Sequence, residues 1–180
     1  MRYCTLDNDY LDYLRNIESR IPYNDYGDDH YKPFFHSLFE IDDLAYVTQI
    51  SSPKSRHRSM HNTIDFKKVF IETNHIKNGR RTKFFVGVVN LNYMFPIPKK
   101  FISDLDFKEI DKVRTFKDNR EKSKYIYFLK QQLKALNQLN LKKDARKLYK
   151  IKYAHPEIGV SKRSLDFKEL ERNAHNYRMK

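Results

Sequence analysis

The stretch "KFFVGVVNLNYMFPIP", residues 83–98, is the longest strand-like run in the chain. Its apolar residues are nearly continuous, which is typical of a strand that is covered on both faces. Gly87 stands inside the run, and a glycine there indicates a bulge or the close approach of another segment. Pro96 and Pro98 close the run. We therefore expect residues 83–98 to form a strand inside the core.

Shorter strand-like runs precede this stretch. They are "RYCTL" (2–6), "FFHSLFEI" (34–41), "LAYVTQI" (44–50) and "FKKVFIE" (66–72). The pair Asp42-Asp43 separates two of these runs and predicts a hairpin. The pair Asn78-Gly79 predicts the turn that leads into residues 83–98.

Helical patterns lie on both sides of the strand-rich part. Near the N-terminus, "DNDYLDYLRNIESRIP" (7–22) predicts a helix that is capped by Asp7 or Asn8 and ends before Ile21-Pro22. From residue 101 onward the apolar period becomes helical. We expect helices near 103–111, where Ser103 would be the cap, and over 121–139, 142–152 and 162–177. This arrangement predicts an α+β fold.

The net charge of the 180-residue chain is +13, and it is unevenly distributed. Residues 1–50 hold 4 basic and 10 acidic side chains, whereas residues 51–100 hold 11 basic and 2 acidic ones. A field of this asymmetry favours a polyanionic partner, with nucleic acid as the first candidate and anionic lipid as the second.

Two further observations exclude classes of protein. The single cysteine, Cys4, excludes an intrachain disulfide and a multi-cysteine metal site. No apolar run is long enough to span a bilayer, and no signal-peptide pattern follows Met1. We therefore expect a soluble, cytoplasmic protein with no membrane partner.

The loop "SSPKSRH" (51–57) begins where the positive charge begins. Pro53 pushes Ser52 towards an extended conformation, so that Ser52 and Lys54 project to one side and Ser51 to the other. A hydroxyl and an ammonium on one rigid edge suit a phosphate oxyanion. The chain has no HExxH motif and no glycine-rich phosphate loop, so we expect a site without metal or cofactor.

Cleavage of RNA fits such a site, because the 2′-hydroxyl of the substrate is the nucleophile and the protein only aligns and stabilises the reacting groups. Two alternatives stay open. The loop could be an inert turn on a non-catalytic RNA- or DNA-binding regulator, or the chain could be a structural protein on an anionic partner such as rRNA.

Four segments of the chain form a recognisable set when they are taken together and in order. They are "YCTLDNDYLDYLRNIESRIP" (3–22), "KPFFHSLFEIDDLAYVTQISSPK" (32–54), "GVVNLNYMFPIP" (87–98) and "YIYFLKQQLKALN" (125–137). This set resembles the ToxN/AbiQ family, the endoribonuclease toxins of type III toxin–antitoxin systems. The resemblance covers about residues 2–150. It implies an α+β fold with a strongly twisted antiparallel sheet flanked by helices, similar to MazF/Kid-type toxins. The whole chain, 1–180, would be one toxin domain with a basic helical extension over about 151–180.

The resemblance also implies an activity and a partner. Members of the family cleave RNA without a metal ion and leave a 2′,3′-cyclic phosphate. A repeat RNA antitoxin, folded as pseudoknots, inhibits them and is processed by them, and toxin and RNA close into cyclic hetero-oligomers. The substrates would be cellular or phage RNA, and the role would be phage defence by abortive infection.

Individual residues can be carried over from the family's motifs. The catalytic set that the resemblance implies is Ser52, Lys54, Ser51, Tyr10, Tyr31 and Lys32, with Tyr26 as the alternative to Tyr31. Tyr10 also fits the apolar stripe of the first helix, so core packing is its alternative role. Lys32 could equally balance Asp28 and Asp29.

We expect a second set of residues to bind RNA. His57 matches a histidine after the family's loop, and neighbouring cations would hold it neutral, which favours a phosphate contact over proton transfer. The others are Arg56, Arg58, Lys99 and Lys100, which we expect beside strand ends near the loop.

Overall fold

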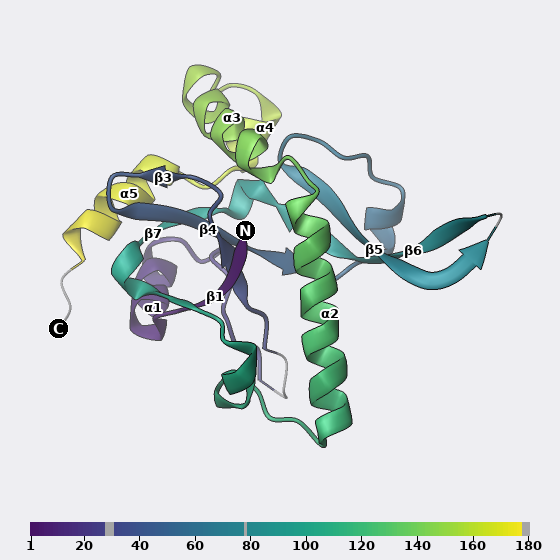
Figure 1. Ribbon diagram of the computed structural model, residues 1–180. Helices are drawn as coiled ribbons and strands as arrows, with labels where there is room; N and C mark the ends of the chain where they lie inside the picture. Colours follow the sequence, from purple (N-terminus) through teal and green to yellow (C-terminus); the bar gives the residue numbers. More distant parts are fainter. Residues whose placement is uncertain (28–30, 78, 178–180) are drawn as a thin grey trace.

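The computed structural model describes residues 1–27, 31–77 and 79–177. It contains a mixed fold of helices and one antiparallel sheet, which confirms the α+β prediction (Figure 1). The strands are β1 (Arg2–Leu6), β2 (Phe34–His36), β3 (Glu40–Ile41), β4 (Leu44–Ser51), β5 (Phe66–Lys77), β6 (Arg80–Asn90), β7 (Phe95–Pro98) and β8 (Ile102–Asp104). Their order is β5-β6-β4-β2-β1-β8, and β3 and β7 also pair with β4.

The helices occupy both ends of the chain, as the periodicity predicts. They are α1 (Asn8–Ile17), α2 (Asn119–Asn137), α3 (Leu141–Ala154), α4 (Gly159–Arg163) and α5 (Phe167–Asn176). Short 3₁₀ turns cover Ser55–Arg58, Leu91–Tyr93, Lys99–Phe101 and Phe107–Lys112. Asp7 caps α1 by accepting a hydrogen bond from the backbone of Tyr10 at 2.8 Å. Throughout the described residues, each helix is too short or too polar to serve as a membrane span.

The stretch 83–98 forms two strands instead of one. β6 ends at Asn90, the 3₁₀ turn Leu91–Tyr93 redirects the chain, and β7 follows. Both strands pair with β4, since Val89 of β6 lies opposite Ile50 and Pro98 of β7 lies opposite Leu44. β4 is therefore enclosed by pairing partners along its length, and its last residues are held between β6 and β2.

Gly87 lies where β6 passes closest to β4. A Cβ atom at this position would lie 2.5 Å from Cγ2 of Ile50 and 2.7 Å from the carbonyl oxygen of Ser51. On its other side, the pairing of β6 with β5 shifts register between Val69 and Phe70. The predicted close approach at Gly87 is therefore confirmed, and an irregularity in the strand pairing lies next to it.

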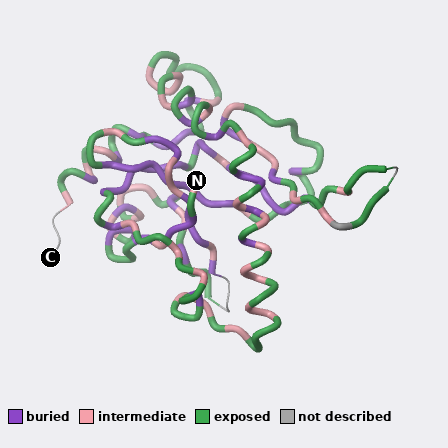
Figure 2. Tube along the Cα trace, in the orientation of Figure 1, coloured by how far each residue is buried: buried purple, intermediate pink, exposed green. Residues whose placement is uncertain are grey.

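The hydrophobic core lies between the sheet and the helices, as the burial pattern in Figure 2 shows. α2 lies across β5 and is tied to β1 by a hydrogen bond from the hydroxyl of Tyr3 to Oε1 of Gln132. The hairpin of β5 and β6 extends from this body as an arm whose outer part is exposed (Figures 1 and 2). In the C-terminal segment, α5 packs on β7, and Phe167 and Leu170 belong to the same core.

Two local predictions differ from the structure, and a third falls partly outside the described residues. Ser103 is not a helix cap, because residues 102–104 pair with β1 as β8; Asp106 caps the 3₁₀ turn that follows. The helix expected over 162–177 is split into α4 and α5 by extended backbone at Ser164, where ψ is 148°. Asn78, half of the predicted turn, lies outside the described residues, while Gly79 has the positive φ, 72°, that such a turn uses.

Candidate active site

The loop that follows β4 is held in an extended conformation and then closed by a short turn. Lys54 has φ −115° and ψ 156°, and the 3₁₀ turn Ser55–Arg58 begins directly after it. The backbone N–H of His57 donates to the carbonyl of Lys54 at 2.9 Å, and the backbone N–H of Lys54 donates to Nδ1 of His57 at 3.1 Å. These two bonds fix the backbone of Lys54, while the side chains of Ser52 and Lys54 stay exposed.

His57 lies beneath the loop and not on its surface. Its side chain is only 5% exposed, and its ring meets the ring of Phe66 edge-on at 5.6 Å. Burial, together with the charges of Arg56 and Lys54, lowers the pKa of His57 and keeps the imidazole neutral. Because Nδ1 accepts the bond from Lys54, the ring proton is on Nε2. The hydrogen bond of Nδ1 shows that His57 positions the backbone of Lys54, while a phosphate contact through Nε2 stays a prediction.

A polar pocket of about 280 Å³ opens beside the loop. Its lining includes the predicted residues Ser51, Ser52, Lys54 and Lys32. Lys32 reaches it because Phe34 of β2 lies opposite Gln49 of β4, which brings the chain before β2 alongside the end of β4. The side-chain amide of Gln49 reinforces this approach by donating to the carbonyl of Lys32 at 2.8 Å. Both Ser51 and Ser52 line this pocket, so the two serines lie close enough to act on one ligand.

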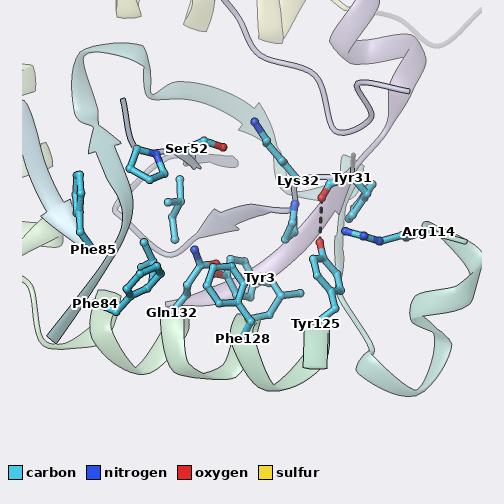
Figure 3. A pocket seen from close by; sticks show the side chains of 15 residues that line it. Tyr3, Tyr31, Lys32, Ser52, Phe84, Phe85, Arg114, Tyr125, Phe128 and Gln132 are labelled. Carbon is cyan, nitrogen blue, oxygen red and sulfur yellow. Dashed lines mark hydrogen bonds between the residues drawn. The ribbon is translucent and has the colours of Figure 1, made fainter. Parts of the chain in front are cut away.

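A second pocket, of about 350 Å³, also includes Ser52 in its lining and is mostly apolar, and because several aromatic rings line it we call it the aromatic pocket (Figure 3). The rings that line it belong to Tyr3, Tyr31, Phe84, Phe85, Tyr125 and Phe128. Ser52 and Lys32 line both pockets, so the two share a wall.

The two loop tyrosines separate between these pockets. Tyr26 lines the polar pocket, where its ring centre lies 4.9 Å from Nζ of Lys32. Tyr31 lines the aromatic pocket and is 7% exposed. Burial raises the pKa of Tyr31, so its hydroxyl stays protonated at neutral pH. The alternatives Tyr26 and Tyr31 therefore occupy different sites and do not compete for one position.

Tyr10 is not part of either pocket. It is fully buried, its ring stacks on Phe101 at 5.1 Å, and it meets Tyr177 edge-on at the same distance. Its hydroxyl donates to the carbonyl of Pro96 at 3.4 Å, and burial raises its pKa. The apolar stripe of α1 accounts for this placement, so Tyr10 packs in the core and does not face the loop.

Lys99 and Lys100 are also remote from the loop, contrary to expectation. They follow Pro98, which lies opposite Leu44, the first residue of β4. The loop leaves the last residue of β4, so the full length of an eight-residue strand, roughly 25 Å at 3.3 Å per residue, separates them. Lys99 pairs there with Glu40 at 2.6 Å. Arg56 and Arg58, by contrast, are exposed on the turn next to Lys54.

Several lining residues were not predicted from the sequence. Tyr125, Phe128 and Gln132 project from α2 into the aromatic pocket, and their spacing of three and four residues does place them on one helix face. Arg114, which lies over the ring of Tyr125 at 4.3 Å, and Arg20, in the polar pocket, carry no local sequence signal.

The loop is also fixed at its far end. Asp65, just before β5, accepts two hydrogen bonds from the guanidinium of Arg163, at 2.6 and 2.9 Å, and one from the hydroxyl of Thr63 at 2.8 Å. Burial alone would raise the pKa of Asp65, but these bonds outweigh it and lower the pKa. This ion pair connects the end of the loop to α4.

The chain is similar to known proteins over nearly its whole length. A family described as "Toxin ToxN, type III toxin-antitoxin system" matches residues 2–175. The endoribonuclease ToxN of Bacillus thuringiensis subsp. kurstaki is 22% identical over 98% of this chain and 84% of its own.

Two solved structures share the fold. One belongs to work on a processed non-coding RNA that regulates a bacterial antiviral system; it has a TM-score of 0.74, 20% identity, and coverage of 99% of this chain and 100% of that one. The other concerns selective toxin inhibition by a non-coding RNA pseudoknot in type III toxin–antitoxin systems; it has a TM-score of 0.67, 23% identity, and coverage of 99% and 98%. With 174 of its residues inside the family match, the chain belongs to the ToxN toxin family of type III toxin–antitoxin systems.

Proposed function

We propose that this protein is an endoribonuclease toxin that cuts RNA at the polar pocket. The observation that carries the proposal is that two serines, Ser51 and Ser52, and two lysines, Lys54 and Lys32, line one pocket at the surface. Hydroxyl donors and cations are the groups that bind a phosphodiester. Family membership and the named activity of the B. thuringiensis relative support the same assignment.

The reaction needs no nucleophile from the protein. The 2′-hydroxyl gives its proton to solvent water and its oxygen bonds to phosphorus, the bond from phosphorus to the 5′-oxygen breaks, and that oxygen takes up a proton from Lys54. Ser52, helped by Ser51, hydrogen-bonds the scissile phosphate and orients it. Lys54 stabilises the charge on the phosphorane and protonates the leaving 5′-oxygen. Lys32 and Tyr31 orient the nucleotide, and the product is a 2′,3′-cyclic phosphate formed without a metal ion.

The partner that we propose is a repeat RNA antitoxin. It would fold as pseudoknots, block the polar pocket, be processed by the toxin, and close with it into a cyclic hetero-oligomer. The non-coding RNAs of the two structural relatives support this partner. The setting would be the cytoplasm, the targets cellular or phage RNA, and the outcome phage defence by abortive infection.

We also propose two features of the fold, one for the domain organisation and one for the shape of the sheet. The whole chain, 1–180, would act as one toxin domain, which is supported by the packing of α5 on β7. The sheet would be strongly twisted and similar to that of MazF/Kid-type toxins.

The test is cleavage by matched serine variants. Ser52→Ala should reduce the rate of RNA cleavage by at least about 100-fold, the size of one lost oxyanion donor. Its binding of RNA should change little, because a neutral hydroxyl contributes about 1 kcal/mol. Ser55→Ala is the control, since Ser55 is an exposed serine on the next turn. Reactions run in EDTA, and product ends are identified by mass spectrometry.

Three results would contradict the proposal. One is a strict need for added magnesium. Another is equal cleavage by the Ser52 and Ser55 variants. The third is tight binding of RNA by the wild type with no cut in any sequence, which would favour the non-catalytic regulator.

A further inference from the structure

The aromatic pocket differs in chemistry from what a phosphate requires. Most of its lining consists of rings and aliphatic side chains, although Lys32, Ser52, Arg114 and Gln132 also contribute, whereas the polar pocket beside it is lined by Ser51, Ser52, Lys32 and Lys54. Its volume of about 350 Å³ is at the small end of the range for sites that bind small organic groups. A ligand for this pocket should therefore be flat, largely apolar and compact.

Stacking surfaces lie on two sides of the pocket. Phe84 projects from β6, and Phe128 and Tyr125 project from α2 (Figure 3). Phe84 is 59% exposed, although apolar rings are normally covered in a folded chain. Aromatic rings that line an open pocket beside a phosphate-binding loop are suited to stack a nucleobase.

Polar groups in the same pocket can read the edge of such a base. The hydroxyl of Tyr31 is buried and has no hydrogen-bond partner among the described residues. Oε1 of Gln132 is occupied by the hydroxyl of Tyr3 at 3.2 Å, so Gln132 offers its Nε2 group as a donor. A buried hydroxyl without a partner is costly, and a ligand with an acceptor or donor at that position would remove the cost.

The shared wall fixes where the base belongs in the substrate. Since Ser52 and Lys32 line both pockets, a phosphate at Ser52 lies directly beside the mouth of the aromatic pocket. We propose that this pocket binds the unpaired base of the nucleotide next to the scissile phosphate and determines which nucleotide is cut. The inference rests on the proposed function, and it restricts the substrate to RNA whose bases are unstacked and accessible, because a duplex cannot place a base there.

The experiment removes a base of the RNA substrate and the aromatic ring of Phe84, first separately and then together. The substrate is a short single-stranded RNA that the wild type cuts, with an abasic nucleotide placed on either side of the cut. The protein is the full chain with Phe84→Ala. Phe70→Ala is the matched control, because Phe70 lies on the paired strand β5 and is 41% exposed but does not line the pocket.

For the wild type, an abasic nucleotide on one side should lower kcat/KM between about fivefold and about 150-fold, the range for one stacked base. Phe84→Ala should lower kcat/KM on the intact RNA by part of this factor. On the abasic RNA the same substitution should lower kcat/KM no further, so the effects of the two changes do not multiply. Phe70→Ala should behave as the wild type. Gln132→Leu should change the ratio of rates among the four bases and leave the abasic rate unchanged.

The two proposals can fail separately. If the wild type cuts no RNA, the proposed function is wrong and this inference falls with it. If cleavage is normal and depends on Ser52, but an abasic nucleotide costs nothing or the losses multiply, only the base pocket is wrong. Equal losses in the Phe84 and Phe70 variants would also overturn it, because they would indicate a general effect on the β5–β6 arm.

Discussion

At the scale of single residues, Gly87 lies against the start of the loop although it lines neither of the two pockets. The carbonyl of Ser51 would lie 2.7 Å from a Cβ atom at residue 87, and a backbone atom cannot move aside as a side chain can. Gly87→Ala should therefore displace the start of the loop and destabilise the fold by about 1–3 kcal/mol, the usual cost of overpacking. Cleavage should fall even well below the melting temperature.

Gly159→Ala provides the control for this prediction. At Gly159 the nearest atom to a Cβ would be Nη1 of Arg163 at 3.7 Å, which is ordinary contact. Denaturant midpoints and kcat of the two variants are compared at 25 °C. If Gly87→Ala is as stable and active as Gly159→Ala, the approach of β6 to Ser51 does not constrain the loop.

Single residues also show how far the sequence can be interpreted. The role of Gly87 follows from its place in an apolar run, because only a local steric need explains a glycine there. Tyr10 is different, since its place on an apolar helix stripe is compatible with the core and with a site at the helix surface. Only the packing of Tyr10 against the rings of Phe101 and Tyr177, which are distant in the sequence, shows that Tyr10 belongs to the core.

At the scale of elements, the loop 52–58 depends on the protonation state of one buried side chain. The pKa of His57 is lowered in the folded protein, so the neutral form contributes stability above the unfolded pKa of about 6.5. That contribution is lost as the pH falls through the folded pKa. Protonation of Nδ1 also breaks its hydrogen bond to the backbone of Lys54.

Cleavage should consequently decline on the acid side, below about pH 6.5. His57→Asn keeps a hydrogen-bond acceptor near the position of Nδ1 but cannot titrate, so it should flatten this decline. His61→Asn, at an exposed position between the 3₁₀ turn Ser55–Arg58 and β5, should leave the decline as in the wild type. The measurement is kcat/KM as a function of pH for the wild type and both variants. If the His57 variant loses activity at acid pH as the wild type does, another group titrates.

At the same scale, helices and strands were predicted well where a local sequence signal marks them. They were predicted poorly where the pairing of strands determines their bounds. Asp7 and the apolar spacing indicate α1, and Asp42-Asp43 indicates the hairpin before β4. The division of residues 83–98 has no such signal, because Leu91-Asn92-Tyr93 contains no proline or glycine. The division arises because both halves of this stretch pair with β4. The same pairing places Lys99 at the far end of that strand.

At the scale of the whole molecule, the candidate site is assembled from distant parts of the chain. Tyr3 of β1, Phe84 of β6 and Gln132 of α2 meet only after the sheet and α2 have packed together. The sequence predicts the loop, whose residues are neighbours, but not the aromatic pocket next to it. Net charge is likewise visible in the sequence, whereas its position relative to the loop is not.

The position of charge can be tested with two matched pairs of cations. Arg56 and Arg58 are exposed beside Lys54, whereas Lys99 and Lys100 lie at the other end of β4, where Glu40 pairs with Lys99. Replacing either pair with alanine removes two positive charges, so a difference between the variants reports location and not net charge. The test uses Ser52→Ala protein and a single-stranded RNA that the wild type cuts, across 50–200 mM salt.

If Arg56 and Arg58 each contact a phosphate, their joint loss should reduce the slope of log affinity against log salt by roughly 1.4, at about 0.7 per contact for single strands. The loss of Lys99 and Lys100 should leave the slope nearly unchanged and lower the affinity only through the weaker overall field. Equal slopes in both variants would mean that RNA senses the field of the whole chain and not a track beside the loop. A larger effect of Lys99 and Lys100 would place the RNA across the opposite end of β4, and the polar pocket would then no longer lie on its path.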